Sequence, residues 1–198
     1  MFAGIIEKVG IVKNIISEGT NIHFHIQSDL TPELYIDQSI AHNGVCLTVV
    51  AIYPDSSYKV TAVKETLEKS NLGSLSISDK INLERSITME SRIDGHHVQG
   101  HVDATATCMD IEEVDGSWYY TFEYSAKFKS LLVNKGSVAI NGVSLTVIDP
   151  TDSQFRIAII PYTYHHTNFH QLSAGSKVNI EFDIIGKYVA RSLSFYQN

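Results

Sequence analysis

The sequence predicts an all-β protein built from two homologous halves, each of which forms a small barrel. The segment SIAHNGVCLTV (39–49) recurs as SVAINGVSLTV (137–147), with eight of eleven positions identical. Two further pairs of segments match at nearly the same offset, 4–15 with 100–111 and 60–84 with 157–181. Two copies of this length indicate a duplicated domain rather than a solenoid, because stacked repeat folds need three or more units.

Short runs rich in β-branched and aromatic residues predict the strands of each half. These runs are NIHFHIQS (21–28), CLTVVAIY (46–53), YKVTAV (58–63), WYYTFEY (118–124) and FRIAII (155–160). Turn signals separate them, namely Asn43-Gly44, Pro54-Asp55, Asp115-Gly116, Asn141-Gly142 and Pro150. Several short strands within about 90 residues favour a closed barrel, which leaves no sheet edge exposed.

Three segments outside these strands predict helices. Residues 30–35 and 125–133 occupy matching places just before the repeated strand, and KYVARSLSFYQ forms an amphipathic tail with Tyr188, Leu193 and Phe195 as apolar anchors. We therefore expect one barrel over 1–92, a second over 97–186, and a C-terminal helix over 187–198.

Composition limits the classes of function that the chain can have. A net charge of −7 with 19% charged residues argues against nucleic acid as a partner, since such binding relies on a basic face. Two cysteines without paired spacing indicate a reducing compartment. The N-terminus lacks the basic and apolar regions of a signal peptide, and no apolar run approaches the roughly 20 residues of a membrane helix. We expect a cytoplasmic protein.

The repeated strand carries a polar pair in each half, on the face opposite its leucine and valine side chains. The pair is Cys46 and Thr48 in the first half and Ser144 and Thr146 in the second. In a single strand, such residues most often hydrogen-bond to the backbone around a core. Because the pair occurs twice, after an Asn-Gly turn each time, a ligand site with one polar pair from each half is the alternative.

Histidines at the joint between the halves are the second candidate feature. The segment GHHVQGHVD places His101 where the first half has Ile5, and histidine titrates near neutral pH. His101 is therefore a candidate proton carrier, although a histidine with a purely structural role is an alternative. His97 and His101 are four residues apart, as are His166 and His170, but flanking glycines and valines argue against a helical zinc site.

A lysine and two strand ends complete the candidate features. Lys135 precedes a glycine, where a solvated turn residue is the usual case, but it stands close in sequence to Ser144. The strand ends VTAVKET and AIIPYT offer main-chain groups to a planar heterocycle, with Thr66 and Thr163 for hydroxyls, and ordinary barrel packing is the alternative.

Together these residues resemble the riboflavin synthase family, and the resemblance covers nearly the whole chain. It rests on the MFxGII start, both NGVxLTV segments, KETL…SNLG, the GHxVQGHVD joint, IPxT and the closing KYVAR. The resemblance implies two Greek-key barrels of six strands each, a C-terminal helix and a homotrimer. It implies no metal and no cofactor, and lumazine synthase is a candidate partner.

The resemblance also implies a transferase reaction. Two molecules of 6,7-dimethyl-8-ribityllumazine react by four-carbon transfer to give riboflavin and 5-amino-6-ribitylamino-uracil. A duplicated barrel offers two similar pockets, and the active site joins the first barrel of one subunit to the second barrel of its neighbour. Unlike residues in the two pockets then assign unlike roles to two copies of one ligand.

Carried over by position, the resemblance implies His101, Ser144, Cys46 and Lys135 as the catalytic group. One substrate site would be lined by Phe2, Gly4, Ile5, Ile6, Ser144, Leu145, Thr146, Ala158, Ile159, Ile160, Pro161, Tyr162 and Thr163. The other would be lined by Cys46, Leu47, Thr48, Thr61, Ala62, Val63, Lys64, Glu65, Thr66, Gly100, His101, Val102 and Lys135. The nucleophile that adds at C7 of the acceptor stays open between water, Ser144 and Cys46.

A non-catalytic antenna protein that holds a lumazine or flavin is the main rival. Such relatives tend to lose the histidine joint and one polar position of the repeated strand, whereas this chain keeps Cys46, Lys135 and Ser144. A flavin reductase domain is a third class, but the chain leaves no room for the nicotinamide domain that it needs.

Overall fold

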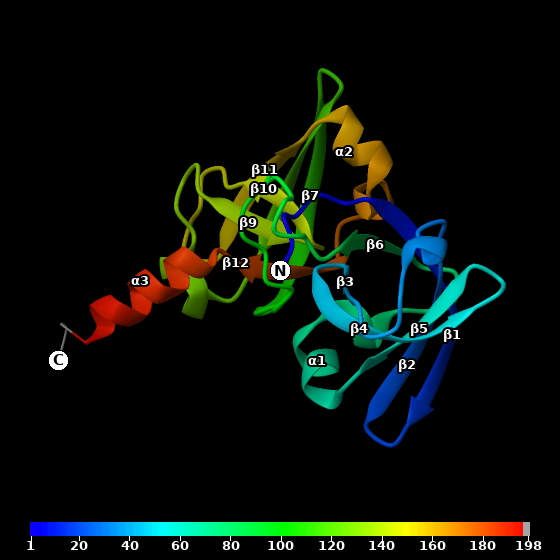
Figure 1. Ribbon diagram of the computed structural model, residues 1–198. Coiled ribbons are helices and arrows are strands. Elements are labelled where there is room, and N and C mark those ends of the chain that lie inside the picture. The colour runs from blue at the N-terminus through cyan, green and yellow to red at the C-terminus, as the bar shows by residue number, and fades with distance from the viewer. Residues whose placement is uncertain (196–198) are drawn as a thin grey trace.

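The computed structural model describes residues 1–195 and shows two lobes, each built from one half of the chain (Figure 1). The first half contains β1 Lys8–Glu18, β2 Asn21–Gln27, η1 Thr31–Glu33, β3 Ser39–His42, β4 Val45–Tyr53, β5 Ser57–Ala62, α1 Lys64–Lys69, η2 Asn71–Ser74 and β6 Lys80–Arg85. The second contains β7 Ala104–Val114, β8 Ser117–Glu123, η3 Ala126–Leu131, β9 Ser137–Ile140, β10 Val143–Thr146, β11 Gln154–Ile159, α2 Pro161–His166, η4 Asn168–Gln171, β12 Lys177–Phe182 and α3 Ile184–Ser194.

Both halves use the same strand order, which confirms the predicted all-β duplication. The first half is a closed antiparallel barrel in the order β1-β2-β5-β4-β3-β6, and β6 pairs back with β1. The second is a six-stranded sheet in the equivalent order β10-β9-β12-β7-β8-β11. In each half a strand pairs with a non-consecutive neighbour, β2 with β5 and β8 with β11, as in a Greek key.

The two halves differ in how the sheet closes. β4 continues to Tyr53 and pairs with β5, whereas β10 ends at Thr146. Beyond Thr146 the chain meets β11 at an isolated bridge between Ile148 and Arg156 and at a turn in which the Thr151 N–H donates to the Gln154 carbonyl. Asp149 has a φ of 46°, and Pro150 has no N–H to donate to a ladder. The ladder between these strands is therefore interrupted in the second half.

Each lobe encloses its own apolar core. Strand alternation supplies the core, since Phe24 and Ile26 of β2 and Tyr120 and Phe122 of β8 all point inward. Each fully buried side chain of this size contributes roughly 1.5–3 kcal/mol to folding. The two large cores are separate clusters, and a small third cluster of Phe2, Ala41, Val98 and Ala139 joins residues of both halves.

Buried asparagines join the two lobes. Asn82 Nδ2 donates to the Asn141 carbonyl at 2.9 Å, and Asn179 Nδ2 donates to the Asn43 carbonyl at the same distance. The Asn43 and Asn141 side chains in turn accept the backbone N–H groups of Asn82 and Asn179. These four residues are at most 1% exposed, so the polar network between the lobes excludes solvent. It fixes the two Asn-Gly turns against each other.

The C-terminal helix α3 projects from the second lobe (Figure 1). It begins at Ile184, three residues before the predicted start, because the Asp183 carboxylate caps the Ile185 N–H at 3.0 Å. Residues 196–198 of the predicted helix lie outside the described part of the chain. Within residues 1–195, no helix combines the length and apolar character needed to cross a membrane.

Candidate active site

A cavity of about 280 Å³ lies beside Cys46 and is called the Cys46 cavity below. Its walls come from the start of β4, from α1 and its flanks, and from the chain that follows the joint between the halves. The lining residues are Val45, Cys46, Val63, Glu65, Thr66, Lys69, Ser70, Gly100, His101 and Val102. Seven of these residues were predicted for one substrate site.

A second cavity, of about 130 Å³, lies beside Ser144 and is called the Ser144 cavity. Its walls come from the equivalent places, namely the start of β10, helix α2 and its flank, and the N-terminal segment of the chain. The lining residues are Gly4, Ile5, Ile6, Val143, Ser144, Tyr162, Thr163, His166 and Thr167. Six of these residues were predicted for the other substrate site.

One wall of each cavity comes from the opposite half of the chain. We call residues 2–6 the first arm and residues 98–102 the second arm; Phe2 and Val98 form a β-bridge between them. The Ser144 N–H donates to the Gly4 carbonyl at 2.8 Å, and the Cys46 N–H donates to the Gly100 carbonyl at 2.9 Å. The first arm therefore completes the cavity of the second lobe, and the second arm completes that of the first.

Glycine is required where each arm touches the repeated strand. Gly4 and Gly100 have φ values of +77° and +81°, a region that other residues rarely adopt. A Cβ added at Gly4 would lie 2.6 Å from Ser144 Cβ, and one at Gly100 would lie 2.5 Å from Cys46 Cβ. The arms thus approach the two polar residues as closely as backbone atoms allow.

His96 contacts the polar residue of the second cavity. Its Nδ1 lies 2.7 Å from Ser144 Oγ, while its Nε2 is buried without a hydrogen-bond partner among residues 1–195. Burial lowers the pKa of His96 below its usual value. A neutral imidazole at this distance can accept the Ser144 hydroxyl proton, so His96 belongs to the candidate site. The sequence placed His96 at the joint but gave no sign of its partner 48 residues away.

The structure does not bring every predicted residue to a cavity. Phe2, Leu47, Ala62 and Ile159 are buried in the apolar cores. Lys135 is exposed on the turn before β9 with a φ of 66° and lines neither cavity. The other predicted residues that line neither cavity are Thr48, Thr61, Lys64, Leu145, Thr146, Ala158, Ile160 and Pro161. The roles of all these residues in substrate binding stay predictions.

Sequence reasoning missed the helical part of each wall. The segments VTAVKET and AIIPYT were taken as strand ends, but their last three residues begin the helices α1 and α2. These helices and the residues that follow them bring Lys69, Ser70, His166 and Thr167 to the cavities. Two signals could have identified these helices. Glu65 and Lys69 pair at the spacing of one helical turn, and Pro161 takes the first position of α2.

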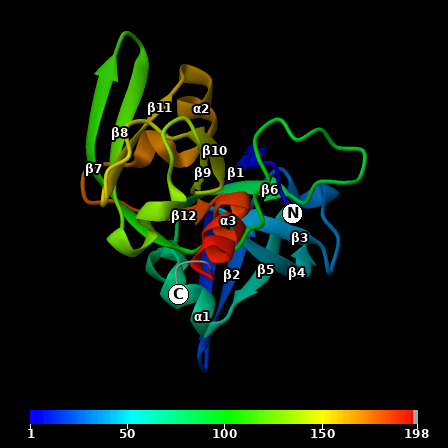
Figure 2. The same ribbon diagram turned by 90° about the vertical axis from the view of Figure 1, so that its left-hand side faces the viewer.

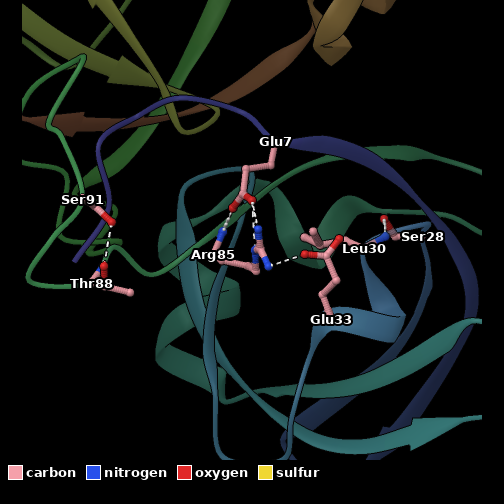
Figure 3. A network of polar contacts seen from close by, with 7 residues as sticks. All are labelled: Glu7, Ser28, Leu30, Glu33, Arg85, Thr88 and Ser91. Atoms are coloured by element: carbon pink, nitrogen blue, oxygen red, sulfur yellow. Dashed lines mark hydrogen bonds and ion pairs between the residues drawn. The ribbon is translucent and has the colours of Figure 1, made fainter.

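A more polar cavity of about 520 Å³ is lined by residues of the first lobe and of the segment that links the halves. Figure 2 shows this linking segment as a long loop. Arg85 of this cavity bridges Glu7 and Glu33, and Thr88 and Ser91 hydrogen-bond within the linking segment (Figure 3). Because Arg85 is already paired with two carboxylates, its charge is compensated within the protein. Cys46, His101, Lys135 and Ser144 do not line this cavity. Among residues 1–195, no three His, Cys, Asp or Glu side chains group as metal ligands.

Comparison with known proteins agrees with this duplication. The Lumazine binding domain family matches the chain twice, at residues 3–86 and 99–183. Riboflavin synthases of Actinobacillus pleuropneumoniae and Bacillus subtilis are 38% and 39% identical to the chain over 194 residues, which is 98% of this chain and 90% of theirs. The riboflavin synthase of Mycobacterium bovis is 37% identical over 96% of this chain and 97% of its own.

Solved structures share the fold. LumP complexed with riboflavin superposes with a TM-score of 0.86 at 24% identity, and LumP complexed with 6,7-dimethyl-8-(1'-D-ribityl) lumazine does so with a TM-score of 0.83 at 23% identity. Each match covers 92% of this chain and 99% of the LumP chain. The two family matches and the long, high-identity alignments lead to one conclusion: the chain belongs to the riboflavin synthase family of lumazine-binding domain proteins.

Proposed function

We propose that this chain is a riboflavin synthase, a transferase that converts two molecules of 6,7-dimethyl-8-ribityllumazine into riboflavin and 5-amino-6-ribitylamino-uracil. The observation that carries the proposal is the pair of cavities. They have the same architecture, but one presents a thiol at Cys46 and the other a hydroxyl at Ser144. Similar walls suit two copies of one ligand, and unlike polar groups suit unlike roles. The relatives named riboflavin synthase support the same reaction.

The residues of the two cavities divide the chemistry as follows. The donor molecule loses a proton from its C7 methyl group, and the ring delocalises the resulting anion. The acceptor is activated by a nucleophile at C7, for which water, Ser144 and Cys46 are the candidates. His96 lies 2.7 Å from Ser144 and can take its proton, while His101 lines the Cys46 cavity as a proton carrier. Much of the rate enhancement would come from holding two rings in contact, up to roughly 7–11 kcal/mol in favourable cases.

Assembly into a homotrimer is part of the proposal. The Ser144 cavity of about 130 Å³ is smaller than the roughly 300–1,000 Å³ of most small-molecule sites, so a neighbouring subunit would complete it. Helix α3 offers apolar surface for such contacts, since Ile185, Tyr188 and Phe195 are 63%, 70% and 65% exposed. A cytoplasmic location and lumazine synthase as a partner remain expectations from the sequence.

Incubation with the lumazine alone tests the reaction. The purified protein should release riboflavin, with two lumazine molecules consumed for each riboflavin formed, measured by absorbance and chromatography without any added carbon donor. A protein that instead retains one tightly bound fluorophore and forms no riboflavin would be an antenna protein, and the proposed function would be wrong.

Truncation tests the assembly. Removing the residues after Lys187 deletes Tyr188, Val189, Leu193 and Phe195, all at least 53% exposed, so the free energy of association should weaken while each barrel stays folded. Sedimentation or light scattering should show dissociation of the truncated protein at concentrations where the full chain remains assembled. Unchanged mass over the same range would contradict a role of α3 in assembly.

A further inference from the structure

Two buried glutamates occupy equivalent places at the ends of β6 and β12. Glu84 and Glu181 are 4% and 3% exposed, yet among residues 1–195 neither forms an ion pair with a lysine or arginine. Their carboxylates instead accept backbone N–H groups of the two arms. A buried carboxylate normally requires such compensation, because burial without hydrogen bonds is costly.

The hydrogen bonds of each glutamate connect it to a cavity of the opposite lobe. Glu84 accepts the N–H groups of Ala3 at 2.7 Å and Gly4 at 3.1 Å, and the Gly4 carbonyl accepts the N–H of Ser144. The first lobe thereby holds the arm that lines the cavity of the second lobe.

The second glutamate repeats this arrangement in the other direction. Glu181 accepts the N–H groups of Gln99 at 2.6 Å, Gly100 at 3.0 Å and His101 at 2.9 Å. The Gly100 carbonyl then accepts the N–H of Cys46. Because the His101 backbone is one of the groups held, the position of its side chain in the Cys46 cavity also depends on Glu181.

We propose that Glu84 and Glu181 are positioning residues that act crosswise, each ionised carboxylate holding the arm that completes the cavity of the other lobe. This inference rests on the proposed function, for which both cavities must be formed at once. It differs from an ordinary packing role in a measurable way. A packing residue would affect its own barrel first, whereas each glutamate should affect the cavity of the opposite barrel.

We call each glutamate together with the arm that it holds a clamp. The charges around the two glutamates make the strength of this clamp depend on pH. Burial, opposed by the arm N–H groups and assisted by the nearby Glu7, raises the pKa of Glu84 to about 7. Arg85 is paired with Glu7 and Glu33, and Arg92 and Asp94 line the same polar cavity as Glu84. Burial likewise raises the pKa of Glu181, with Asp103 raising it and Lys187 lowering it.

The free energy of unfolding and the closure of the arms should depend on pH with opposite signs. A carboxyl whose pKa is raised on folding stabilises the fold when protonated, so its contribution to the free energy of unfolding falls as pH rises from about 4.5 to about 7. For a carboxyl that stays buried when the arm detaches, arm closure responds in the opposite direction, because the arm N–H groups lower its pKa and so favour the ionised form. Arm closure should therefore strengthen over the same pH range.

Thiol labelling of the full chain tests the crosswise action without relying on turnover. Cys46 borders the second arm, and the fully buried Cys108 serves as an internal reference. We expect Glu181→Gln to raise the labelling rate of Cys46 by about tenfold, the effect of losing a charge-assisted hydrogen bond, and Glu84→Gln to leave it nearly unchanged. Glu33→Gln is the matched control, because Glu33 pairs with the Arg85 side chain and touches neither arm.

Amide hydrogen exchange provides the second readout. Protection in residues 2–6 should fall in Glu84→Gln, and protection in residues 98–102 should fall in Glu181→Gln. In the wild-type protein, amide protection is corrected for the pH dependence of intrinsic exchange. The corrected protection of both arms should decline as pH falls, and for the first arm, which Glu84 holds, the decline should occur near pH 7. This pH series needs no substitution, so it tests the clamp even if a variant fails to fold.

Turnover measured on the same proteins distinguishes failure of the proposed function from failure of the clamp. With the wild-type protein active, both Gln variants should lower kcat more than they raise KM for the lumazine. If the wild-type protein forms no riboflavin, the proposed function fails, and labelling and exchange still test the clamp. The clamp is overturned if Cys46 labels equally fast in both variants, or if arm protection does not change with pH or substitution.

Discussion

Replacing His101 with alanine is expected to lower turnover by about 10²- to 10⁴-fold, the usual contribution of a positioned proton carrier. His101 is exposed and lines the Cys46 cavity, where its imidazole can exchange protons with a bound ligand. The substitution removes the ring but keeps the backbone N–H that Glu181 accepts at 2.9 Å. The second arm should therefore stay in place. The measurements are kcat with 6,7-dimethyl-8-ribityllumazine and the Kd for riboflavin by fluorescence quenching, which should change little.

His97→Ala is the matched control for this experiment. His97 is also an exposed histidine of the joint, but it contacts Met1 Sδ and lines neither of the two candidate cavities. It should retain nearly wild-type kcat. Full activity of His101→Ala would show that His101 carries no proton in the rate-limiting chemistry. Loss of riboflavin binding in the same variant would indicate a binding role instead.

Replacing Gly100 with alanine should destabilise the protein by about 2–4 kcal/mol. The positive φ of 81° costs about 1 kcal/mol or more for a residue with a Cβ, and overpacking adds typically 1–3 kcal/mol. The new Cβ would lie 2.5 Å from Cys46 Cβ and 2.8 Å from Cε2 of the fully buried Phe2. Relief of this overlap must move the second arm away from Cys46, so kcat should also fall by about 10²-fold. Denaturant unfolding and steady-state turnover measure the two effects.

Gly116→Ala separates backbone strain from steric overlap. Gly116 has nearly the same φ, +77°, but a Cβ there would meet nothing within 4 Å. It should lose only about 1 kcal/mol of stability and keep full activity. Equal destabilisation by the two substitutions would show that the close approach of the second arm to Cys46 has no energetic consequence.

Local patterns in the sequence were sufficient for the overall architecture. The near-constant offset between the halves predicted two similar units, and both adopt the same strand order. The Asn-Gly pairs predicted the turns before β4 and β10, where Asn43 and Asn141 have φ values of 47° and 46°. Alternation predicted which side chains of β2 and β8 enter the cores. These features depend on neighbours within a few residues, so one sequence is enough to find them.

The same local patterns could not predict features that depend on segments distant in the sequence. The six-residue helices α1 and α2 are too short for a helical period to stand out from the strands before them. Repeat similarity also suggested two equal barrels, although the ladder between β10 and β11 is interrupted near Pro150. Lys135 was grouped with the Cys46 site; it lines neither cavity, and its role there stays a prediction.

By itself the sequence determined the duplication, the strands, and the thiol and hydroxyl at equivalent positions of the two halves. The family resemblance had grouped residues 4–6 with Ser144 and residues 100–102 with Cys46. Only the tertiary structure decided how these segments are held together, including the backbone hydrogen bonds of the arms and the contact of His96 with Ser144. The reason is that the arms and the repeated strands are far apart in sequence. Their meeting depends on how the two cores pack through the buried asparagines, which no local period encodes.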